Sequence, residues 1–442
     1  MNYLISSIQL NGSVNKTLLR NMKLFAKNHD ARILLYVMPG RNKDETLIPT
    51  ILLDDEDIEL LYLGKDGQKL NNNLKIFDHK ILASMVNPLT GMNLKLHRDF
   101  SWTLPSPKIR YMSYPNTGKH PRFLATTGSL THGNYKEWTA QGIRAGLEHQ
   151  YGFSFINIKS NRLFSFVPVE AQKNGNFHYL RDEYKNGKVY DSQPEALVLG
   201  DWHTGDTCPK TRKATIAMIG ELKPKRVILH DFYDGKSINP HEGDDCLSKA
   251  LRFSKNLHIL EDELRACLKE LNFFAKKFPD VEFVVVESNH DIFLYRYLAK
   301  GMYPMDACNS IFAASLYGYV GEYMKGKGPK PTLCLAMEMI GAVAGNVRFL
   351  KEDEEYRVKG IELGYHGHRG VNGARGTSAS FSNYNLKMIT GHEHTPKIHP
   401  NGMVVGTSTH LKLSYTKGAS SWLNAHGLLY SSGKYTLLTL IF

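Results

Sequence analysis

Aspartate, asparagine and histidine side chains collect at five places in the second half of the sequence, each directly after a short apolar run. In open α/β sheets, ligands bind in the crevice at the carboxyl ends of the strands. A single aspartate at a strand end is usually a helix cap, and a single histidine is usually a hydrogen-bonded structural residue. Five such ends together instead predict one chemical site. The clusters are Gly200-Asp201-Trp202-His203, His230-Asp231-Phe232-Tyr233-Asp234-Gly235, Ser288-Asn289-His290-Asp291, His366-Gly367-His368 and Gly391-His392-Glu393-His394.

The types and spacing of these side chains indicate metal chemistry. Residues two apart on extended backbone leave from the same face, so Asp201 and His203 can bind one ion, as can His392 and His394. Carboxylate, imidazole and amide ligands without a thiolate suit manganese, iron or zinc. Because there are more ligands than one ion needs, the pattern favours two metal ions about 3.5–4 Å apart.

The apolar runs before these clusters are expected to be buried strands of a sheet. Residues 196–199, 226–229 and 281–286 are short and rich in β-branched or aromatic side chains, which is typical of strands buried on both faces. The segments IELGY and LKMIT are strand-like as well. A long amphipathic helix is expected before residue 281, which makes this half α/β. Its apolar stripe is Leu257, Leu260, Leu264, Cys267, Leu271, Phe274 and Phe278.

The series D-x-H, D-x-x-D, N-H-D, H-G-H and G-H-x-H, between about residues 197 and 406, resembles the calcineurin-like metallophosphoesterase superfamily. The layout is also similar to its nuclease branch, which includes phage-type DNases. The resemblance implies a four-layer α/β fold, a double β-sheet sandwich flanked by helices, with a dinuclear metal centre at the strand ends. Asp201, His203 and His394 would hold the first ion, Asp231 would bridge both ions, and Asn289, His366 and His392 would complete the second, with His368 as a weaker candidate outside this set.

The resemblance also implies a mechanism. Two cations would acidify a shared water and neutralise charge on the phosphoryl oxygens. His290 matches the catalytic histidine of the family and would be the general acid that protonates the departing alkoxide. Asp234, three residues after Asp231, would orient this imidazole and stabilise its charge. No serine or cysteine nucleophile is required.

Two positions depart from the pattern of the superfamily. Where glycine is usual, His230 precedes Asp231 and Ser288 precedes Asn289. Those glycines permit close backbone packing near the metals. Serine is a small change, whereas His230 could crowd the site, act as an outer donor or point away. Every residue that matches a ligand position is intact, so an active centre is expected.

Residues 1–190 are expected to form a basic accessory domain of the α+β type, and residues 191–442 the catalytic domain. The boundary is placed in the polar, turn-rich segment 173–194. A helix is expected over 137–149. The apolar runs in this half are Ile33–Val37, Ile51–Leu53, Leu60–Leu63, Ile109–Tyr111 and Phe153–Ile158.

A basic stretch, residues 61–120, carries nine basic side chains against three acidic ones, which leaves a net charge of +6. Phe100, Trp102, Tyr111 and Tyr114 are interleaved with it. A basic surface with aromatic side chains suits a polyanion whose bases can stack. An ordinary basic surface over an aromatic core explains the pattern equally well. The basic residues are Lys65, Lys69, Lys75, Lys80, Lys95, Arg98, Lys108, Arg110 and Lys119, opposed by Asp66, Asp78 and Asp99.

The composition limits the class of protein and its partners. The 442 residues include 55 Lys and Arg against 43 Asp and Glu, a formal net charge of +12, which favours an anionic partner. The hydrophobic fraction of 42% excludes global disorder. No apolar run approaches the ~18 residues of a membrane span, the start lacks a signal-peptide pattern, and the five cysteines form no C-x-x-C pair. A cytoplasmic protein with reduced thiols is therefore expected, in the host cytoplasm if a phage encodes it.

Three functions are consistent with these patterns. The first is a manganese-dependent nuclease with DNA, or RNA, as its substrate. The second is a phosphodiesterase or phosphatase for small nucleotides or other phosphoesters, and the third is a metal-binding scaffold with vestigial chemistry. The arginine that follows the second motif in protein Ser/Thr phosphatases is absent, because Asp234 is followed by Gly235-Lys236. A homo-oligomer is possible, since the hydrophobic segment YTLLTLIF is either a core strand, which we favour, or an interface.

Overall fold

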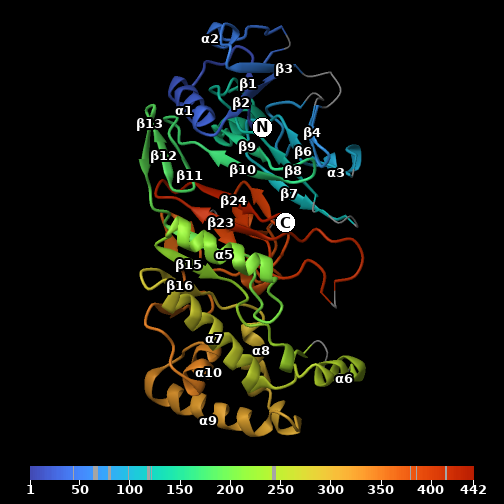
Figure 1. The fold of residues 1–442 in the computed structure, drawn as a ribbon, viewed down its shortest axis with the longest axis vertical. Helices are drawn as coiled ribbons and strands as arrows, with labels where there is room; N and C mark the ends of the chain where they lie inside the picture. The colour runs from blue at the N-terminus through green and yellow to red at the C-terminus, as the bar shows by residue number, and fades with distance from the viewer. Residues whose placement is uncertain are drawn as a thin grey trace. The chain divides into compact units, whose positions relative to one another are not determined.

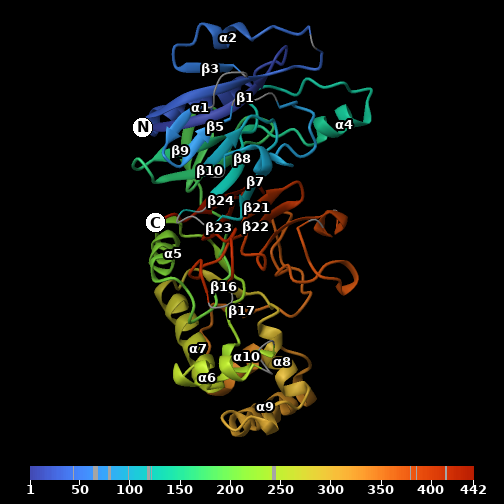
Figure 2. The same ribbon diagram turned by 90° about the vertical axis from the view of Figure 1, so that its right-hand side faces the viewer.

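The computed structural model describes residues 1–42, 44–62, 68–77, 81–97, 99–116, 120, 122–240, 245–378, 380–384, 386–413 and 416–442. Contacts between residues divide the chain into two compact units (Figure 1 and Figure 2). The first unit comprises residues 1–195, 394–406 and 411–442, and the second comprises residues 196–393 and 407–410. The division into separately folding domains at residue 190 stays a prediction.

The second unit is built around a parallel sheet. Its strands are β14 (Ala196–Val198), β15 (Arg226–Leu229), β16 (Glu282–Val285) and β17 (Val347–Phe349). They lie in the order β17-β16-β15-β14, and each pairs with its neighbour in parallel. Strands β14, β15 and β16 are almost entirely buried, which explains their continuous apolar sequences. The three strands predicted before the first three clusters are confirmed.

Helix α7 (Leu260–Lys277) lies between β15 and β16 in the chain and buries most of the predicted apolar stripe. The helix begins later than the periodicity suggests, and Leu257, which precedes it, is 41% exposed. Asn309 explains this start, because its Oδ1 atom accepts a hydrogen bond from Leu260 N at 2.8 Å. That bond satisfies one of the N–H groups that the first turn of a helix leaves without a partner.

The second unit also contains helices and short strands that lie between and after the strands of this sheet along the chain. Strand β20 covers four residues of the predicted strand LKMIT, and β19 covers the first two residues of IELGY. The two strands pair in parallel, while β18 pairs antiparallel with β19. No helix in the described part of the chain combines the length and the hydropathy that crossing a membrane requires. The elements are α5 (Pro209–Leu222), α6 (Cys246–Ser254), α8 (Asp291–Ala299), α9 (Ser310–Lys327), α10 (Thr332–Ile340), β18 (Arg357–Val358), β19 (Ile361–Glu362) and β20 (Lys387–Thr390), with 3-10 turns at Lys236–Ile238, Tyr303–Met305, Val371–Gly373 and Ser380–Tyr384.

The first unit contains a mixed five-stranded sheet in the order β10-β9-β1-β2-β3. Strands β1, β2 and β3 are parallel, and β9 and β10 are antiparallel to their neighbours. Helix α1 (Lys16–Asn28) makes the crossover between β1 and β2 that parallel pairing requires. Its Phe25 ring lies 5.3 Å from that of Phe153 and 5.0 Å from that of Phe155. The strands are β1 (Asn2–Gln9), β2 (Ala31–Met38), β3 (Ile58–Tyr62), β9 (Gly152–Ile158) and β10 (Phe164–Glu170).

The remaining strands of the first unit form three groups. One group follows the order β22-β21-β7-β8-β6-β5-β4, a second is β11-β12-β13, and the third is the hairpin β23-β24. Most of β24, the predicted C-terminal strand, is buried, as expected of a core strand. The bounds are β4 (Lys69–Asn71), β5 (Leu74–Ile76), β6 (Ser101–Leu104), β7 (Tyr111–Tyr114), β8 (Arg122–Thr126), β11 (Phe177–Tyr179), β12 (Asp182–Lys185), β13 (Lys188–Asp191), β21 (Lys397–His399), β22 (Gly402–Val404), β23 (Ala425–Leu429) and β24 (Tyr435–Thr439).

Short helices complete the first unit. Helix α4 (Ala140–Leu147) lies inside the predicted range 137–149, and α3 spans Met92–Lys95. The apolar run 51–53 forms the helical turn α2 (Thr50–Leu53), and Leu63 of another run lies outside the described residues. The chain is thus a mixed α/β protein with several multi-stranded sheets, in agreement with the α/β class. The four-layer sandwich stays a prediction.

Candidate metal centre

The first two polar clusters lie side by side because their backbones continue the pairing of β14 and β15. The N–H groups of residues 202, 203 and 204 donate to the carbonyls of residues 230, 231 and 232 at 2.9, 2.7 and 3.1 Å. This brings Asp201, His203 and Asp231 to one edge of the sheet, where all three are buried. One ligand atom from each lies within 4.8 Å of the others. The cluster could therefore hold a metal ion.

The Asp231 carboxylate lies between two histidines that the resemblance assigns to different ions. Its Oδ2 atom is 3.6 Å from His203 Nε2 and 3.2 Å from His366 Nε2. Its Oδ1 atom is buried and accepts no hydrogen bond within the described part of the chain. Burial would raise the pKa of Asp231, but neighbouring histidines, His366 first, hold it well below the usual value. An ionised carboxylate in contact with both histidines is what a bridging ligand requires.

Asn289, His366 and His392 meet at one point beside Asp231. The Asn289 Oδ1 atom is 3.1 Å from His366 Nε2 and 3.0 Å from His392 Nδ1. Ligand atoms that lie about 2.0–2.2 Å from a metal are about 2.8–3.1 Å apart in octahedral and about 3.3–3.6 Å apart in tetrahedral coordination. The three side chains thus have the spacing of a coordination shell, and the amide and imidazole donors fit the metals predicted from the sequence.

Four of the predicted ligands occupy left-handed backbone conformations. The φ angles are +46° at His203, +43° at Asp231, +73° at His392 and +54° at His394. Residues with a Cβ atom rarely adopt this region, and such conformations persist where the surrounding structure enforces them, often at functional sites. The fold therefore maintains a costly backbone at the predicted ligands.

The main chain of His392 approaches Asp201 closely. Its N–H group donates a hydrogen bond to Asp201 Oδ2 at 2.7 Å. Gly391 permits this approach, because a Cβ atom there would lie 2.1 Å from Asp201 Oδ1. A glycine is therefore needed at this position of the G-H-x-H cluster, because any side chain would collide with the Asp201 carboxylate.

Asp234 contacts both His203 and His290. Its Oδ1 atom is 2.7 Å from His203 Nδ1, whereas His290 Nδ1 donates to its main-chain carbonyl at 2.6 Å and lies 3.8 Å from Oδ1. The carboxylate thus orients His203, and the carbonyl orients His290. Burial would raise the pKa of Asp234, but the hydrogen bond with His203 lowers it to about 2. Burial would lower the pKa of His203, but Asp234 and Asp231 raise it to about 9.

The sequence analysis missed an ion pair beside this group. Lys236 pairs with Asp206, and Lys236 Nζ lies 3.7 Å from Asp234 Oδ2. A cation therefore adjoins the predicted catalytic residues. Asp206 follows His203 by three positions and Lys236 follows Asp234 by two, so closeness to the motifs is the signal that could have found them.

His230, the first departure from the superfamily pattern, lies beside a predicted ligand. Its ring is fully buried, with its centroid 5.5 Å from that of His366. Burial and the neighbouring His366 lower the pKa of His230 to about 4, so the ring is neutral at physiological pH. The alternative in which His230 points away from the site is therefore wrong. His368 also lies 5.5 Å from His366 by ring centroids, and burial and His366 lower its pKa to about 3.

Ser288, the second departure, participates in the start of α8. Its N–H group donates to Asp291 Oδ2 at 3.0 Å, and Asp291 N donates to Ser288 Oγ at 3.2 Å. This reciprocal pair has the pattern of a capping box, which satisfies donors at the start of a helix. It encloses Asn289 and His290, so a serine here serves to fix the segment that carries both predicted functional side chains.

His394 belongs to the first unit together with residues 395–406. Its side chain is buried, and its ring centroid lies 4.3 Å from that of Trp422 in the same unit. Its role as a ligand of the first ion stays a prediction.

The basic stretch divides into interior and surface residues. Lys108 is fully buried and bonded to Glu148, and Arg110 is buried as well. Lys69 and Lys95 are exposed. Of the aromatic residues, Trp102, Tyr111 and Tyr114 are buried in the core, so the interpretation that these side chains stack on bases is wrong for these three. Lys65, Lys80, Arg98 and Lys119, with Asp66 and Asp78, lie outside the described residues.

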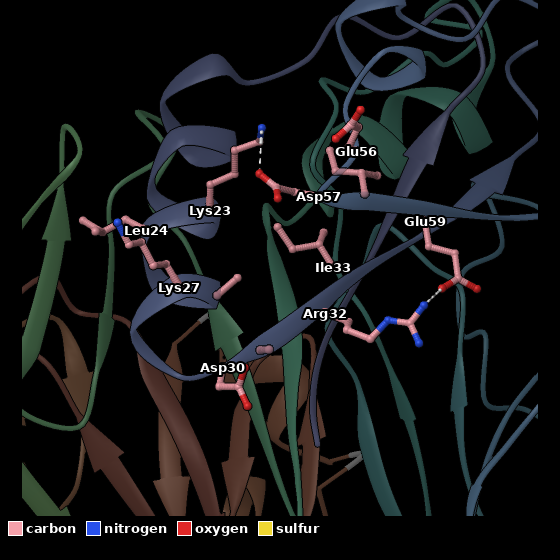
Figure 3. A pocket seen from close by; sticks show the side chains of 12 residues that line it. Lys23, Leu24, Lys27, Asp30, Arg32, Ile33, Glu56, Asp57 and Glu59 are labelled. Carbon is pink, nitrogen blue, oxygen red and sulfur yellow. Dashed lines mark hydrogen bonds and ion pairs between the residues drawn. The ribbon is translucent and has the colours of Figure 1, made fainter.

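A cavity of about 690 Å³ lies beside α1 in the first unit (Figure 3), and none of the predicted site residues is among its lining residues. Its wall carries charges of both signs, from Lys23, Lys27, Arg32, Asp30, Glu56, Asp57 and Glu59. Some of these charges are paired: Lys23 Nζ is 2.5 Å from Asp55 Oδ2 and 3.5 Å from Asp57 Oδ2, and Arg32 Nη2 is 2.6 Å from Glu59 Oε2. A wall of mixed sign does not single out one class of ionic ligand.

Comparisons with known proteins relate the chain to a phage protein. Protein A1 of Escherichia phage T5 is 27% identical over 373 residues, which cover 81% of this chain and 65% of the relative. The chain thus spans less than two thirds of the length of this distant relative. No family model matches the chain, and no solved structure matches it.

Proposed function

We propose that this protein is a metal-dependent phosphodiester hydrolase that uses two divalent ions and acts on DNA. The position of Asp231 carries the proposal, because one buried carboxylate contacts both His203 and His366. A two-metal hydrolytic site is built in this way, from two sets of ligands that have one ionised carboxylate in common. The order of the motifs, which is similar to that of the metallophosphoesterases, supports the same chemistry.

The described residues that would hold the ions form two adjoining sets. Asp201 and His203 would bind one ion, Asn289, His366 and His392 the other, and Asp231 both; His394 is the further ligand that the resemblance implies. Oxygen and imidazole donors without a thiolate suit manganese, with iron and zinc as alternatives. The chemistry that such a pair supplies when bound is acidification of water and neutralisation of charge on the phosphoryl oxygens.

The protein itself would move the proton. His290 Nδ1 donates to the Asp234 carbonyl at 2.6 Å, which fixes the ring and leaves Nε2 as the nitrogen that can protonate a departing alkoxide. Burial lowers the pKa of His290, while Asp231 and Asp234 act to raise it. The carbonyl partner thus orients the ring, and the nearby negative charge offsets part, but not all, of the lowering of its pKa by burial.

The choice of DNA rests on charge. The chain carries a formal net charge of +12, and exposed lysines such as Lys69 and Lys95 can contact phosphates without reading sequence. RNA has the same backbone charge and is an alternative substrate. The cytoplasm, including that of a phage-infected host, is the compartment that fits such a substrate.

A plasmid assay tests the proposal. Purified protein is mixed with supercoiled plasmid in Mn²⁺, Fe²⁺, Zn²⁺ or EDTA, and bis(p-nitrophenyl) phosphate is supplied in parallel. We expect cleavage of the plasmid with Mn²⁺ and none with EDTA or in Asp201→Ala. Hydrolysis of the small diester without cleavage of DNA or RNA would reject the nuclease and leave a small-substrate phosphodiesterase. Metal binding without turnover of any phosphoester would establish the vestigial scaffold.

A small-nucleotide phosphodiesterase or phosphatase is the second candidate. A cavity of about 390 Å³ is partly lined by His366, and sites for small molecules typically measure about 300–1,000 Å³. A whole nucleotide could therefore bind beside the metal centre. Competition between cyclic or linear mononucleotides and plasmid in the same assay distinguishes the two candidates.

A further inference from the structure

The cavity beside the metal centre has its own chemical character. It lies within the second unit, has a volume of about 390 Å³ and shares His366 with the metal centre. Glu287, which follows β16, and the segment 364–370 line it, together with Glu352 and Tyr384. A group that enters this cavity would adjoin a phosphate held at the metal centre.

The charges of the wall disfavour a phosphate inside the cavity. Glu352 and Asp353 contribute carboxylates, Glu287 contributes a carboxyl group whose pKa burial and Glu352 raise to about 7, and Arg369 is the one lysine or arginine among the lining side chains. Arg369 Nη2 is 2.5 Å from Glu352 Oε1, so its charge is already compensated. Like charges placed together repel a ligand of the same sign. The wall instead suits a neutral group that has both hydrogen-bond donors and acceptors.

Two tyrosines give the cavity an aromatic surface. Tyr365 and Tyr384 are both half-buried and line the cavity, with ring centroids 6.3 Å apart and ring planes inclined at 53°. Aromatic side chains of this kind hold unpaired bases by stacking, whatever the sequence. The cavity therefore offers ring faces on which a nucleobase can stack, and carboxyl and guanidinium groups with which the edge of the base can form hydrogen bonds.

We propose that this cavity binds the unpaired guanine base of the nucleotide next to the cleaved phosphodiester. The inference rests on the proposed function and names a part of its substrate. Guanine offers adjacent N1–H and N2–H donors to a carboxylate such as Glu287, and its O6 and N7 atoms are the usual partners of arginine. Thymine has no exocyclic amino group. Only a base outside the stack of a duplex can enter such a cavity.

Calorimetric titration of the full chain with dGMP and with dTMP in Mn²⁺ tests the proposal. The two nucleotides carry the same phosphate, so the difference between their affinities reports on the base. We expect dGMP to bind at least about tenfold more tightly than dTMP, as for one well-formed base contact. Equal affinities, or no measurable binding of dGMP, would overturn the proposal.

Substitutions locate the binding in this cavity. Tyr384→Ala should weaken dGMP and dTMP binding alike, about tenfold for each, because stacking does not depend on the base. Glu287→Gln should weaken dGMP binding about tenfold and reduce the preference over dTMP. Tyr384→Phe keeps the aromatic ring and should retain dGMP binding, which would show that the ring, and not the hydroxyl group, holds the base. Tyr319→Ala, on the solvent side of α9 at 38% exposure, is the matched control. Unchanged dGMP binding in both Tyr384→Ala and Glu287→Gln would contradict the assignment.

The outcome separates this inference from the proposed function. Because the titration measures binding, selective dGMP binding without plasmid cleavage supports the base site and rejects the nuclease. Plasmid cleavage with equal binding of dGMP and dTMP supports the nuclease and rejects the base site. Mapping of cut positions in a single-stranded oligo-dT that contains one dG gives a second measurement, with cuts expected next to the dG.

Discussion

Gly391 and Asp201 are so close that no side chain fits between them. A Cβ atom on Gly391 would lie 2.1 Å from Asp201 Oδ1, while the next N–H group, that of His392, donates to Oδ2 at 2.7 Å. Two predicted ligand segments that are 190 positions apart are thus joined by a main-chain contact. The Asp201 carboxylate can occupy its buried position only because Gly391 has no Cβ atom.

Gly391→Ala should displace this carboxylate and weaken metal binding. Partners that orient metal ligands typically contribute about 10–100-fold in affinity, and we expect a loss in this range. Gly345→Ala is the matched control, since a Cβ atom there meets nothing within 4 Å. Manganese content after equilibrium dialysis measures the effect. Equal metal content in the two variants would contradict the proposed role of the close approach.

His290→Ala should retain metal and lose catalytic rate. A positioned general acid contributes about 10²–10⁴-fold to a rate, so kcat for plasmid cleavage should fall by that order. Asp201→Ala should lose both metal and activity. Parallel measurement of bound manganese and kcat distinguishes the two roles. Normal turnover in His290→Ala would show that another group supplies the proton.

Chelation should lower the melting temperature of the protein. A ligand that binds only the folded state stabilises it by about 2.7 kcal/mol at a concentration of 100 Kd, and Asp201 and Asp231 repel one another when no cation is bound. We expect a higher melting temperature in Mn²⁺ than in EDTA, and a smaller difference for Asp231→Asn. Identical melting curves of the unmodified protein in Mn²⁺ and EDTA would count against a metal centre.

The stability of the first unit should fall as the pH drops from about 6.5 towards 4. His149 Nδ1 is 2.8 Å from the Tyr135 hydroxyl and Nε2 is 2.9 Å from the Thr131 carbonyl, and burial lowers the pKa of His149 to about 4. The folded protein keeps this ring neutral, whereas the unfolded chain takes up a proton below about pH 6.5. The expected loss is about 1 kcal/mol at pH 5.5.

Urea unfolding at pH 7.5 and 5.5 measures this dependence. His149→Gln should show a smaller loss of unfolding free energy between the two pH values than the unmodified protein. His97→Gln, at a side chain that is 66% exposed, serves as the control and should keep the original dependence. The assignment fails if His149→Gln shows the same loss as that control.

Lys108→Met should destabilise the first unit. Lys108 is fully buried, and its Nζ atom bonds both Glu148 Oε2 and the Met85 carbonyl at 2.8 Å. Removal of one partner of a buried ion pair leaves a charge and polar groups without compensation, at a cost of about 3 kcal/mol. Lys95→Met, at an exposed position, should change the unfolding free energy by less than about 0.5 kcal/mol. Similar effects of the two substitutions would refute the structural role of Lys108.

The sequence was sufficient to predict the strands and the polar clusters that follow them, because both depend on local patterns. Runs such as 226–229 are continuous in the chain, and the side chains after them must reach the same edge of a parallel sheet. This is why Asp201, His203 and Asp231 could be grouped before their geometry was known.

Contacts between distant residues were beyond such reasoning. Lys108 is interior only because Glu148, 40 positions away, meets it, and a count of basic residues assigns it to the surface. Likewise, the pairing of Asp234 Oδ1 with His203 instead of His290 depends on a rotation of side chains that spacing does not encode. Burial of Trp102 and Tyr111 follows from the packing of several strands.

The predicted ligands of the second unit are distributed over five segments between residues 201 and 392. A ribosome releases these segments in order, and domains fold as units during synthesis. The metal centre therefore cannot assemble until the segment with His392 has emerged. An unfinished chain would therefore carry no complete candidate centre, and any activity that the proposed function implies would begin only after this segment has been made.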